Sequence, residues 1–287
     1  MPSWQAHAAS VYLRATRKRR YRTHEDGERS LAQGLPAAEP PASLAGRVTS
    51  ERMAGAQVHR VVPADGAPHS RGQLVYWHGG GFINGIATQH WKLIDHLVSA
   101  TGREALVPQY GLAPGNHLGD AMDLLGAVLD VVHGPVHVLG DSAGGTLALL
   151  QAHLHPGRIA GLTLIAPWLD LAMGNPAVDA VEPRDPWLTR AGLRPAASAW
   201  ARGRDLRDPH VSPLFGDHDQ LPPTLVIVGD RDICMPDCQV LAECAGSSVR
   251  LQVGAGLPHV YPLLPIPEAR PAREQIVRHV VETLAER

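Results

Sequence analysis

Short apolar runs alternate with helical patterns of apolar and polar positions from residue 57 to the end of the chain. Runs of this kind are typical of strands that are buried on both faces, and the helical stretches between them can connect parallel strands. The order therefore predicts an α/β fold whose mostly parallel central sheet has helices on both faces. The expected strands are residues 58–63, 73–77, 105–109, 136–139, 162–166, 224–228 and 249–253.

Two of the connecting helices are marked by regularly spaced apolar residues. One is expected over 124–132 and ends at Gly134, and the other is expected over 276–284 and begins near Pro271. We interpret both as ordinary packing helices.

Two segments interrupt this alternation. Residues 4–21 predict an amphipathic helix, and a Pro- and Ala-rich linker follows at 34–41. Residues 173–207 show no strand pattern and are expected to form an insertion over the sheet. We therefore expect a cap helix and linker at 1–45 and a catalytic domain at 46–287, with the cap insertion at about 173–207. The apolar stripe of the helix expected over 4–21 consists of Trp4, Ala8, Val11, Tyr12 and Ala15.

Basic residues crowd the end of this first helix, from Arg14 to Arg22. Cations are favoured at a helix C-terminus by the helix dipole, so we interpret them as a solvated helix end. A membrane or nucleic-acid patch is the less favoured alternative.

Composition narrows the class of protein. With 287 residues, 44% of them hydrophobic and 19% charged, the chain can build one large core. The net charge of -2 and a pI near 6.8 disfavour a nucleic-acid partner. No run is long and apolar enough to cross a bilayer and no secretory signal is recognisable, so we expect no stable membrane insertion and a cytoplasmic location.

The three cysteines lie within eleven positions, at Cys234, Cys238 and Cys244. An odd number fits a reducing compartment better than a disulfide framework. We interpret them as small residues of one helix, because no second cluster of ligands completes a metal site.

A nucleophile elbow is indicated at 140–144, where the sequence reads Gly-Asp-Ser-Ala-Gly. The pentapeptide stands between the expected strand at 136–139 and a helical run at 146–154. A tight strand-to-helix turn needs glycines around the serine, and it exposes the hydroxyl of Ser142 beside a helix N-terminus. By itself the pentapeptide is also compatible with a structural glycine turn.

A second glycine-rich loop, His-Gly-Gly-Gly-Phe at 78–82, follows another expected strand. Unobstructed backbone N–H groups at such a loop can stabilise the oxyanion of acyl transfer, at about 3 kcal/mol for each donor. The candidate donors are the N–H groups of Gly80, Gly81 and Ala143. For His78 we favour a role in orienting the loop over one in proton transfer.

A serine hydroxyl needs a histidine base and a carboxylate that orients this base. In the α/β-hydrolase fold these follow the serine in the order acid, then histidine. Asp230 and Asp232 come after the strand at 224–228, and His259 comes after the strand at 249–253. Position alone leaves the choice between the two aspartates open.

Six separate strings resemble the bacterial hormone-sensitive lipase family of esterases, in the family's order and spacing. The resemblance identifies Asp232 as the acid, His259 as the base, Ser142 as the nucleophile and Gly80, Gly81 and Ala143 as the oxyanion donors, which leaves Asp230 to shape its loop. The strings are HGGGF at 78–82, GDSAGG at 140–145, APWLDL at 166–171, DPHVSPLFG at 208–216, PPTLVIVGDRD at 222–232 and LPHVYP at 257–262.

One string departs from the family. The family's Tyr-Arg-Leu-Ala-Pro-Glu is replaced at 110–115 by Tyr-Gly-Leu-Ala-Pro-Gly, so Gly111 and Gly115 stand in place of two charged residues. We expect the anchoring of Asp141 or of the base of the cap to differ. Cys234 and Cys238 also stand where aliphatic residues are commoner, and we favour helix packing over sensitivity to oxidation.

The resemblance implies a serine carboxylesterase that acts on a small-molecule ester with a short to medium acyl chain, including lactones and acetylated molecules. It implies a helical cap, no metal and no organic cofactor, and it makes a homodimer an open alternative. An amidase or N-deacetylase would use the same triad, and a ligand-binding protein could keep the fold without the chemistry. Candidate pocket walls are Trp91, Trp187 and Tyr261.

Overall fold

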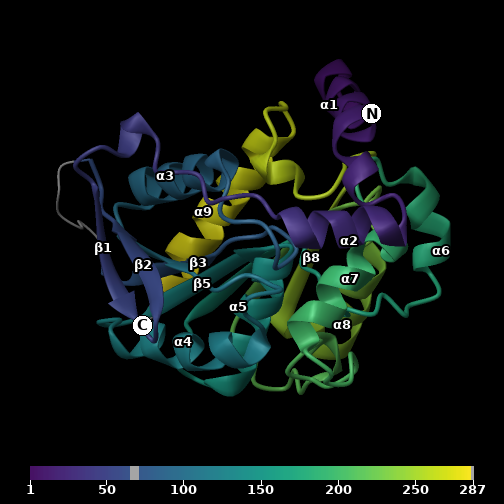
Figure 1. Ribbon diagram of the computed structural model, residues 1–287. Coiled ribbons are helices and arrows are strands. Elements are labelled where there is room, and N and C mark those ends of the chain that lie inside the picture. Colours follow the sequence, from purple (N-terminus) through teal and green to yellow (C-terminus); the bar gives the residue numbers. More distant parts are fainter. Residues whose placement is uncertain (65–70, 286–287) are drawn as a thin grey trace.

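One sheet of eight strands forms the centre of the computed structural model, which describes residues 1–64 and 71–285 (Figure 1). The strand order is β1-β2-β4-β3-β5-β6-β7-β8. Neighbours from β4 to β8 run parallel, whereas β2 runs antiparallel to both β1 and β4. The strands are β1 Val48–Met53, β2 Ala56–Val61, β3 Gln73–Trp77, β4 Ala105–Gln109, β5 Val136–Asp141, β6 Gly161–Ile165, β7 Thr224–Gly229 and β8 Val249–Gly254.

The predicted α/β class and mostly parallel sheet are confirmed, and all seven expected strands are present with bounds that differ by at most two residues. β1 was not predicted. Four of its six residues are exposed, so this antiparallel edge strand lacks the apolar run by which the other strands were recognised.

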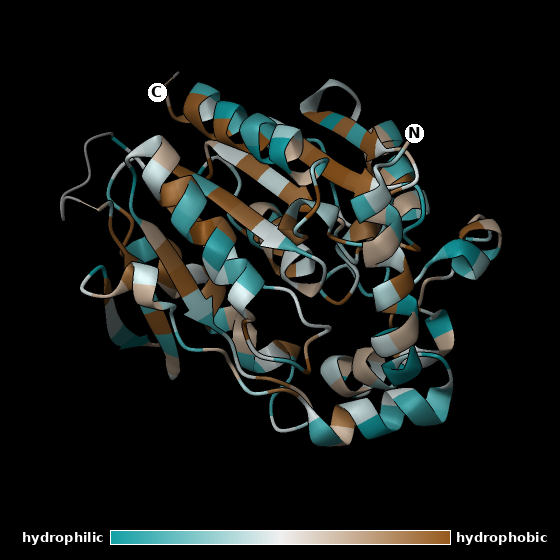
Figure 2. Cartoon of the chain, turned by 90° about the horizontal axis from the view of Figure 1, so that it is seen from above, coloured by the Kyte–Doolittle hydropathy of each residue, from teal (hydrophilic) through white to brown (hydrophobic). Residues whose placement is uncertain are grey.

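Helices cover both faces of the sheet. α3 and α9 pack against each other on one face, and α4 and α5 pack against each other on the other face, where α8 covers β7 and β8 (Figure 1). Hydrophobic residues are concentrated in the strands, and the outer sides of the helices are hydrophilic (Figure 2). These helices are α3 Thr88–Thr101, α4 Leu118–Asp130, α5 Ala143–Leu154, α8 Met235–Ala245 and α9 Ala269–Ala285.

Four further helices lie beyond the carboxyl ends of the central strands. α1 Trp4–Thr16 and α2 His24–Gln33 precede the sheet, and α6 Val178–Val181 and α7 Arg190–Ala201 lie between β6 and β7. We call these four helices, with the loop between α6 and α7, the cap. α2 packs closely on α7, because a Cβ at Gly27 would lie 2.2 Å from the carbonyl oxygen of Gly192. None of the described helices is long and apolar enough to span a bilayer.

The first helix does not bury the stripe that its pattern marks. Trp4, Val11 and Tyr12 are 75%, 69% and 57% exposed, whereas Ala6 and Leu13 face the protein. The N-terminus is instead fixed by Ser3, whose N–H and hydroxyl both bond the carboxylate of Glu268. The helix is amphipathic in pattern, but the apolar stripe faces solvent.

Candidate active site

The elbow between β5 and α5 holds its serine in a strained conformation. Ser142 has φ 51° and ψ −119°, a region that residues with a side chain rarely occupy. Its neighbours have no room for a Cβ: one at Gly140 would lie 2.2 Å from the carbonyl oxygen of Gly144, and one at Gly144 would lie 2.0 Å from that of Trp77. The turn therefore needs these glycines, and it places Ser142 half-buried at the carboxyl edge of the sheet.

Three predicted side chains, from loops after three different strands, form one hydrogen-bonded line. The Nε2 atom of His259 lies 2.9 Å from the Oγ of Ser142, and its Nδ1 atom lies 2.8 Å from an Oδ of Asp232. A carboxylate can only accept, so Nδ1 carries the proton and Nε2 is free to accept one from the serine hydroxyl. This is the geometry that a nucleophile, a base and an orienting acid require.

The imidazole of His259 lies in a negative environment. Burial alone would lower its pKa, but the charge and hydrogen bond of Asp232, with smaller effects of Asp185 and Asp141, raise it above the usual value. The side chains of His259 and Asp232 are almost fully buried, so water screens this attraction little. The charge of Asp232 therefore stabilises the imidazolium form more than the surroundings of a free histidine do.

Both oxygens of the Asp232 carboxylate take part in hydrogen bonds. Its second oxygen accepts a hydrogen bond of 2.9 Å from the N–H of Cys234. Asp230, the alternative acid, does not meet His259 by a hydrogen bond but accepts one of 2.6 Å from the N–H of Gly256 in the histidine loop. The geometry thus pairs Asp232 with His259 and leaves Asp230 to join the two loops.

The proposed oxyanion donors lie on the loop after β3 and at the start of α5. Gly80 and Gly81 have φ 129° and 63°, which a residue with a side chain adopts with difficulty. Neither N–H, nor that of Ala143, donates a hydrogen bond to another described residue. Ala143 begins α5, where the N–H groups have no acceptor in the helix.

Asp141 fastens the glycine loop to the elbow. One of its oxygens accepts from the hydroxyl of Tyr76 at 2.8 Å and from the N–H of Gly79 at 2.9 Å, and the other lies 3.2 Å from Nε2 of His90. Because Nδ1 of His90 accepts the N–H of Ala87, Nε2 donates to the carboxylate. Burial would raise the pKa of Asp141, but the contacts with His90, Tyr76 and Gly79 lower it.

The departure at 110–115 has a local explanation. A Cβ at Gly111 would lie 2.3 Å from the side chain of Asn116, so the space of a larger side chain is taken. Tyr110 donates its hydroxyl proton to the carbonyl oxygen of His78, and Ala113 donates its N–H to that of Phe82. Hydrogen bonds from this loop therefore hold the glycine loop, and Asp141 is anchored by Tyr76, Gly79 and His90.

His78 lies beneath the loop. Its ring stacks on Tyr110 at 4.5 Å between centroids, and Nδ1 donates to the carbonyl oxygen of Gly79 at 2.7 Å. Burial, and then His90, lower its pKa to about 4, so it is neutral at physiological pH. Its side chain makes no hydrogen bond to Ser142, in keeping with a role in orienting the loop.

The cap and the linker both meet the glycine loop. Phe82, which has a positive φ, stacks on Trp200 of α7 with ring centroids 4.3 Å apart. In the linker, Leu35 and Ala38 pair with backbone groups at 84–86. The glycine loop after β3 is therefore held by contacts with α7 on one side and with the linker on the other.

Of the three residues expected to line the pocket, one packs against the hydrogen-bonded residues Ser142, His259 and Asp232. The half-buried Trp187 packs edge-on against His259 with ring centroids 5.7 Å apart. Trp91 is fully buried and donates its indole N–H to Ala38, and Tyr261 is 2% exposed. We therefore assign these two to the core.

Two polar residues near the site were not predicted from the sequence. His90 gives no signal beyond its place at the start of α3, and Asp185 shows only the Asp-Pro pair of a turn. Asp185 is fully buried and accepts hydrogen bonds from Trp187, Leu188 and Ile233. It connects the cap to the loop of Asp232.

One group of described residues could in principle approach a metal ion. Donor atoms of Asp232, Cys234 and His259 lie within 4.8 Å of one another. The carboxylate and Nδ1 are already paired, and burial, then Asp232, raise the pKa of the Cys234 thiol well above its usual value. A protonated thiol is a poor ligand, so the donors do not favour a metal.

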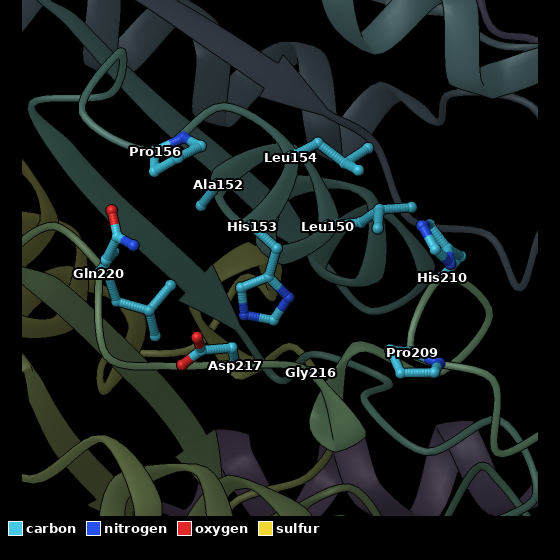
Figure 3. A pocket seen from close by; sticks show the side chains of 11 residues that line it. Leu150, Ala152, His153, Leu154, Pro156, Pro209, His210, Gly216, Asp217 and Gln220 are labelled. Carbon is cyan, nitrogen blue, oxygen red and sulfur yellow. The ribbon is translucent and has the colours of Figure 1, made fainter.

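A separate cavity of about 220 Å³ lies at the far end of α5, around His153 (Figure 3). Nε2 of His153 lies 3.1 Å from Nδ1 of His218, and burial, then His218, lower the pKa of His153 to about 4. The helix length places this cavity about 15 Å from Ser142. It contains none of the predicted site residues.

The chain is similar in sequence to known hydrolases. The family model of the alpha/beta hydrolase fold matches residues 74–263. LipR of Mycobacterium tuberculosis, which carries the name of an acetyl-hydrolase, is 37% identical over 237 residues, or 77% of this chain and 75% of that protein. An acetyl-hydrolase of Streptomyces hygroscopicus is 33% identical over 67% of this chain and 70% of its own length.

Solved esterase structures share the fold of this chain. A crystal structure of an esterase from the bacterial hormone-sensitive lipase family has a TM-score of 0.75 and 25% identity, and 99% of each chain is covered. The esterase EstE5 reaches a TM-score of 0.80 at 24% identity, also over 99% of each chain, which shows the shared fold. The predicted resemblance to this family is confirmed, and the chain belongs to the alpha/beta hydrolase fold family.

Proposed function

We propose that this protein is a serine carboxylesterase that cleaves esters with short acyl chains through an acyl-enzyme. The observation that carries the proposal is the position of His259, which lies 2.9 Å from the hydroxyl of Ser142 and 2.8 Å from the carboxylate of Asp232. The names of the relatives LipR and the Streptomyces acetyl-hydrolase support an acetyl ester as the first substrate class to test.

The reaction follows from the hydrogen bonds. Nε2 of His259 takes the proton of the Ser142 hydroxyl while the Oγ of Ser142 forms a bond to the ester carbonyl carbon. The carbonyl oxygen becomes an oxyanion. The N–H groups of Gly80, Gly81 and Ala143 donate to this oxyanion. Their orientation is fixed before substrate binds, so little reorganisation is needed in the transition state.

The second half of the cycle uses the same base. The tetrahedral intermediate collapses, the alcohol leaves with the proton from His259, and the acyl group stays on Ser142. Water then gives a proton to His259 and attacks the acyl carbon. Collapse of that intermediate returns the proton to Ser142 and releases the acid.

Hydrolysis of p-nitrophenyl acetate tests this assignment. Replacing Ser142 by Ala removes the nucleophile, and we expect kcat to fall by roughly 10⁴-fold or more. An unchanged thermal midpoint would show that the variant is folded. Near wild-type turnover by the folded variant would refute the proposal.

A parallel assay with p-nitroacetanilide, the amide that matches p-nitrophenyl acetate in its acyl group, separates an esterase from an amidase. Amine departure needs fuller protonation by His259 than departure of a phenolate, so we expect the ester to react far faster. Faster cleavage of the amide would favour the amidase alternative.

A further inference from the structure

The cap contributes a buried carboxylate that lies behind the base. Asp185 lies between α6 and α7 and has no exposed surface. One of its oxygens accepts from the N–H groups of Trp187 at 2.7 Å and Leu188 at 2.9 Å, and the other accepts from the N–H of Ile233 at 3.0 Å. A single side chain thus joins a cap loop to the residue that follows Asp232.

This connection reaches His259 by two routes. The cap loop that Asp185 closes presents Trp187, whose ring packs edge-on against the imidazole of His259. The other oxygen of Asp185 accepts the N–H of Ile233, which lies between Asp232 and Cys234 in the sequence. The N–H of Cys234 in turn donates to the carboxylate of Asp232. Both the packing and the orientation of the base therefore depend on Asp185.

Charge supports the same connection. Asp185 faces Asp232, Cys234 and His259 on the catalytic side, and on its other side Lys18 donates its ammonium proton to the Asp185 carbonyl oxygen. Burial, and then Asp232, raise the pKa of Asp185 to about 6. A negative charge at this position stabilises the imidazolium that forms in the reaction.

We propose that Asp185 is a positioning residue for ester hydrolysis, which holds Trp187 against His259 and fixes the loop of Asp232. This role rests on the proposed function, because it acts through the base of that reaction. It assigns to the cap a part in setting the protonation and orientation of the base.

The test is the pH profile of kcat/KM for Asp185→Asn with p-nitrophenyl acetate. The amide keeps the size of the side chain, but it lacks the charge and presents an NH₂ group to one of the three N–H donors. We expect kcat to fall about tenfold, more than KM rises, and the acidic limb to move about half a pH unit lower, since His259 loses a stabilising charge.

Asp170→Asn is the matched control. Asp170 is 3% exposed and accepts the N–H groups of Ala172 and Gly174 at 2.9 and 2.7 Å, so it closes a loop in the same way without contact to His259. We expect the acidic limb of this variant to stay at the wild-type pH. An unmoved limb in Asp185→Asn, or an equal shift in Asp170→Asn, would overturn the proposal.

Trp187→Leu covers the case in which Asp185→Asn does not fold. This change leaves the N–H of residue 187 and the Asp185 carboxylate in place but removes the aromatic edge from His259. We expect a severalfold lower kcat and a wild-type thermal midpoint, and unchanged kcat would contradict the role of Trp187. An inactive wild-type enzyme would instead refute the proposed function, so the two failures can be told apart.

Discussion

Two buried carboxylates lie near the hydrogen-bonded line of Ser142, His259 and Asp232. Asp141 lies in the elbow under the glycine loop, and Asp185 lies in the cap behind His259. Both accept several hydrogen bonds, but Asp141 also accepts from two polar side chains, Tyr76 and His90. Among the described residues, Asp185 accepts only from backbone N–H groups.

The difference in partners gives opposite pKa shifts. Burial raises both values, but the side-chain partners of Asp141 outweigh it, whereas the neighbouring charge of Asp232 adds to it at Asp185. Asp141 is therefore a permanent anion that stabilises the site. The charged form of Asp185 is less stable in the fold, because the carboxylate is buried and lies close to the negative charge of Asp232.

The largest effect is expected for Asp141→Ala. The change leaves the hydroxyl of Tyr76, the N–H of Gly79 and Nε2 of His90 without their acceptor in a buried site. We expect the free energy of unfolding to fall by about 3 kcal/mol. Urea unfolding measures this loss.

The glycine loop should also lose its alignment in Asp141→Ala, so we expect kcat/KM for p-nitrophenyl acetate to fall by about a hundredfold. A stable variant with a wild-type rate would show that the loop is anchored elsewhere.

An effect that is at most as large, and that depends on pH, is expected for Asp185→Asn. A raised pKa means that the folded protein holds a proton that the unfolded chain has lost, so ionisation of Asp185 destabilises the fold between its ordinary pKa of 3.8 and about 6. The stability of the wild type relative to the variant should therefore fall by at most about 3 kcal/mol over this range and stay constant above it.

Thermal midpoints of both proteins between pH 4 and pH 8 measure this difference. Asp141 does not contribute to it, because its lowered pKa adds stability that is lost only as the pH falls below the ordinary range. A difference that does not vary with pH would show that Asp185 ionises normally.

The smallest effect is expected for Tyr76→Phe. It removes one of three donors to Asp141 and leaves Gly79 and His90 in place. We expect a loss of about 1 kcal/mol in the free energy of unfolding and a severalfold lower kcat/KM. A loss as large as that of Asp141→Ala would show that the hydroxyl alone carries the anchoring.

The same contrast explains what the sequence could predict. Asp141 and Ser142 lie in the elbow string between a strand and a helix, and His259 follows a strand end, so local pattern made Ser142 and His259 candidates. Their roles, and the choice of Asp232 over Asp230, came from the resemblance of six separate strings to one family. The strands β3 and β4 were likewise predicted with the bounds that they have, because their apolar runs are continuous.

The parts that were missed depend on contacts between distant segments or lack an apolar pattern. Asp185 reaches the site only through the packing of the cap, and His90 reaches Asp141 only through the position of α3. β1 and α2 are polar elements and so gave no signal, and the stripe with Trp4 did not show which side of α1 would be covered.

The central claim is that Ser142 is a nucleophile activated by His259. Labelling of the native protein with a fluorophosphonate, followed by peptide mapping, tests this most directly, because the probe reacts with an activated serine and a mere binding pocket leaves it unreacted. We predict one adduct on Ser142, and its loss in His259→Ala. No adduct in the folded native protein, or an adduct on another residue, would contradict the account.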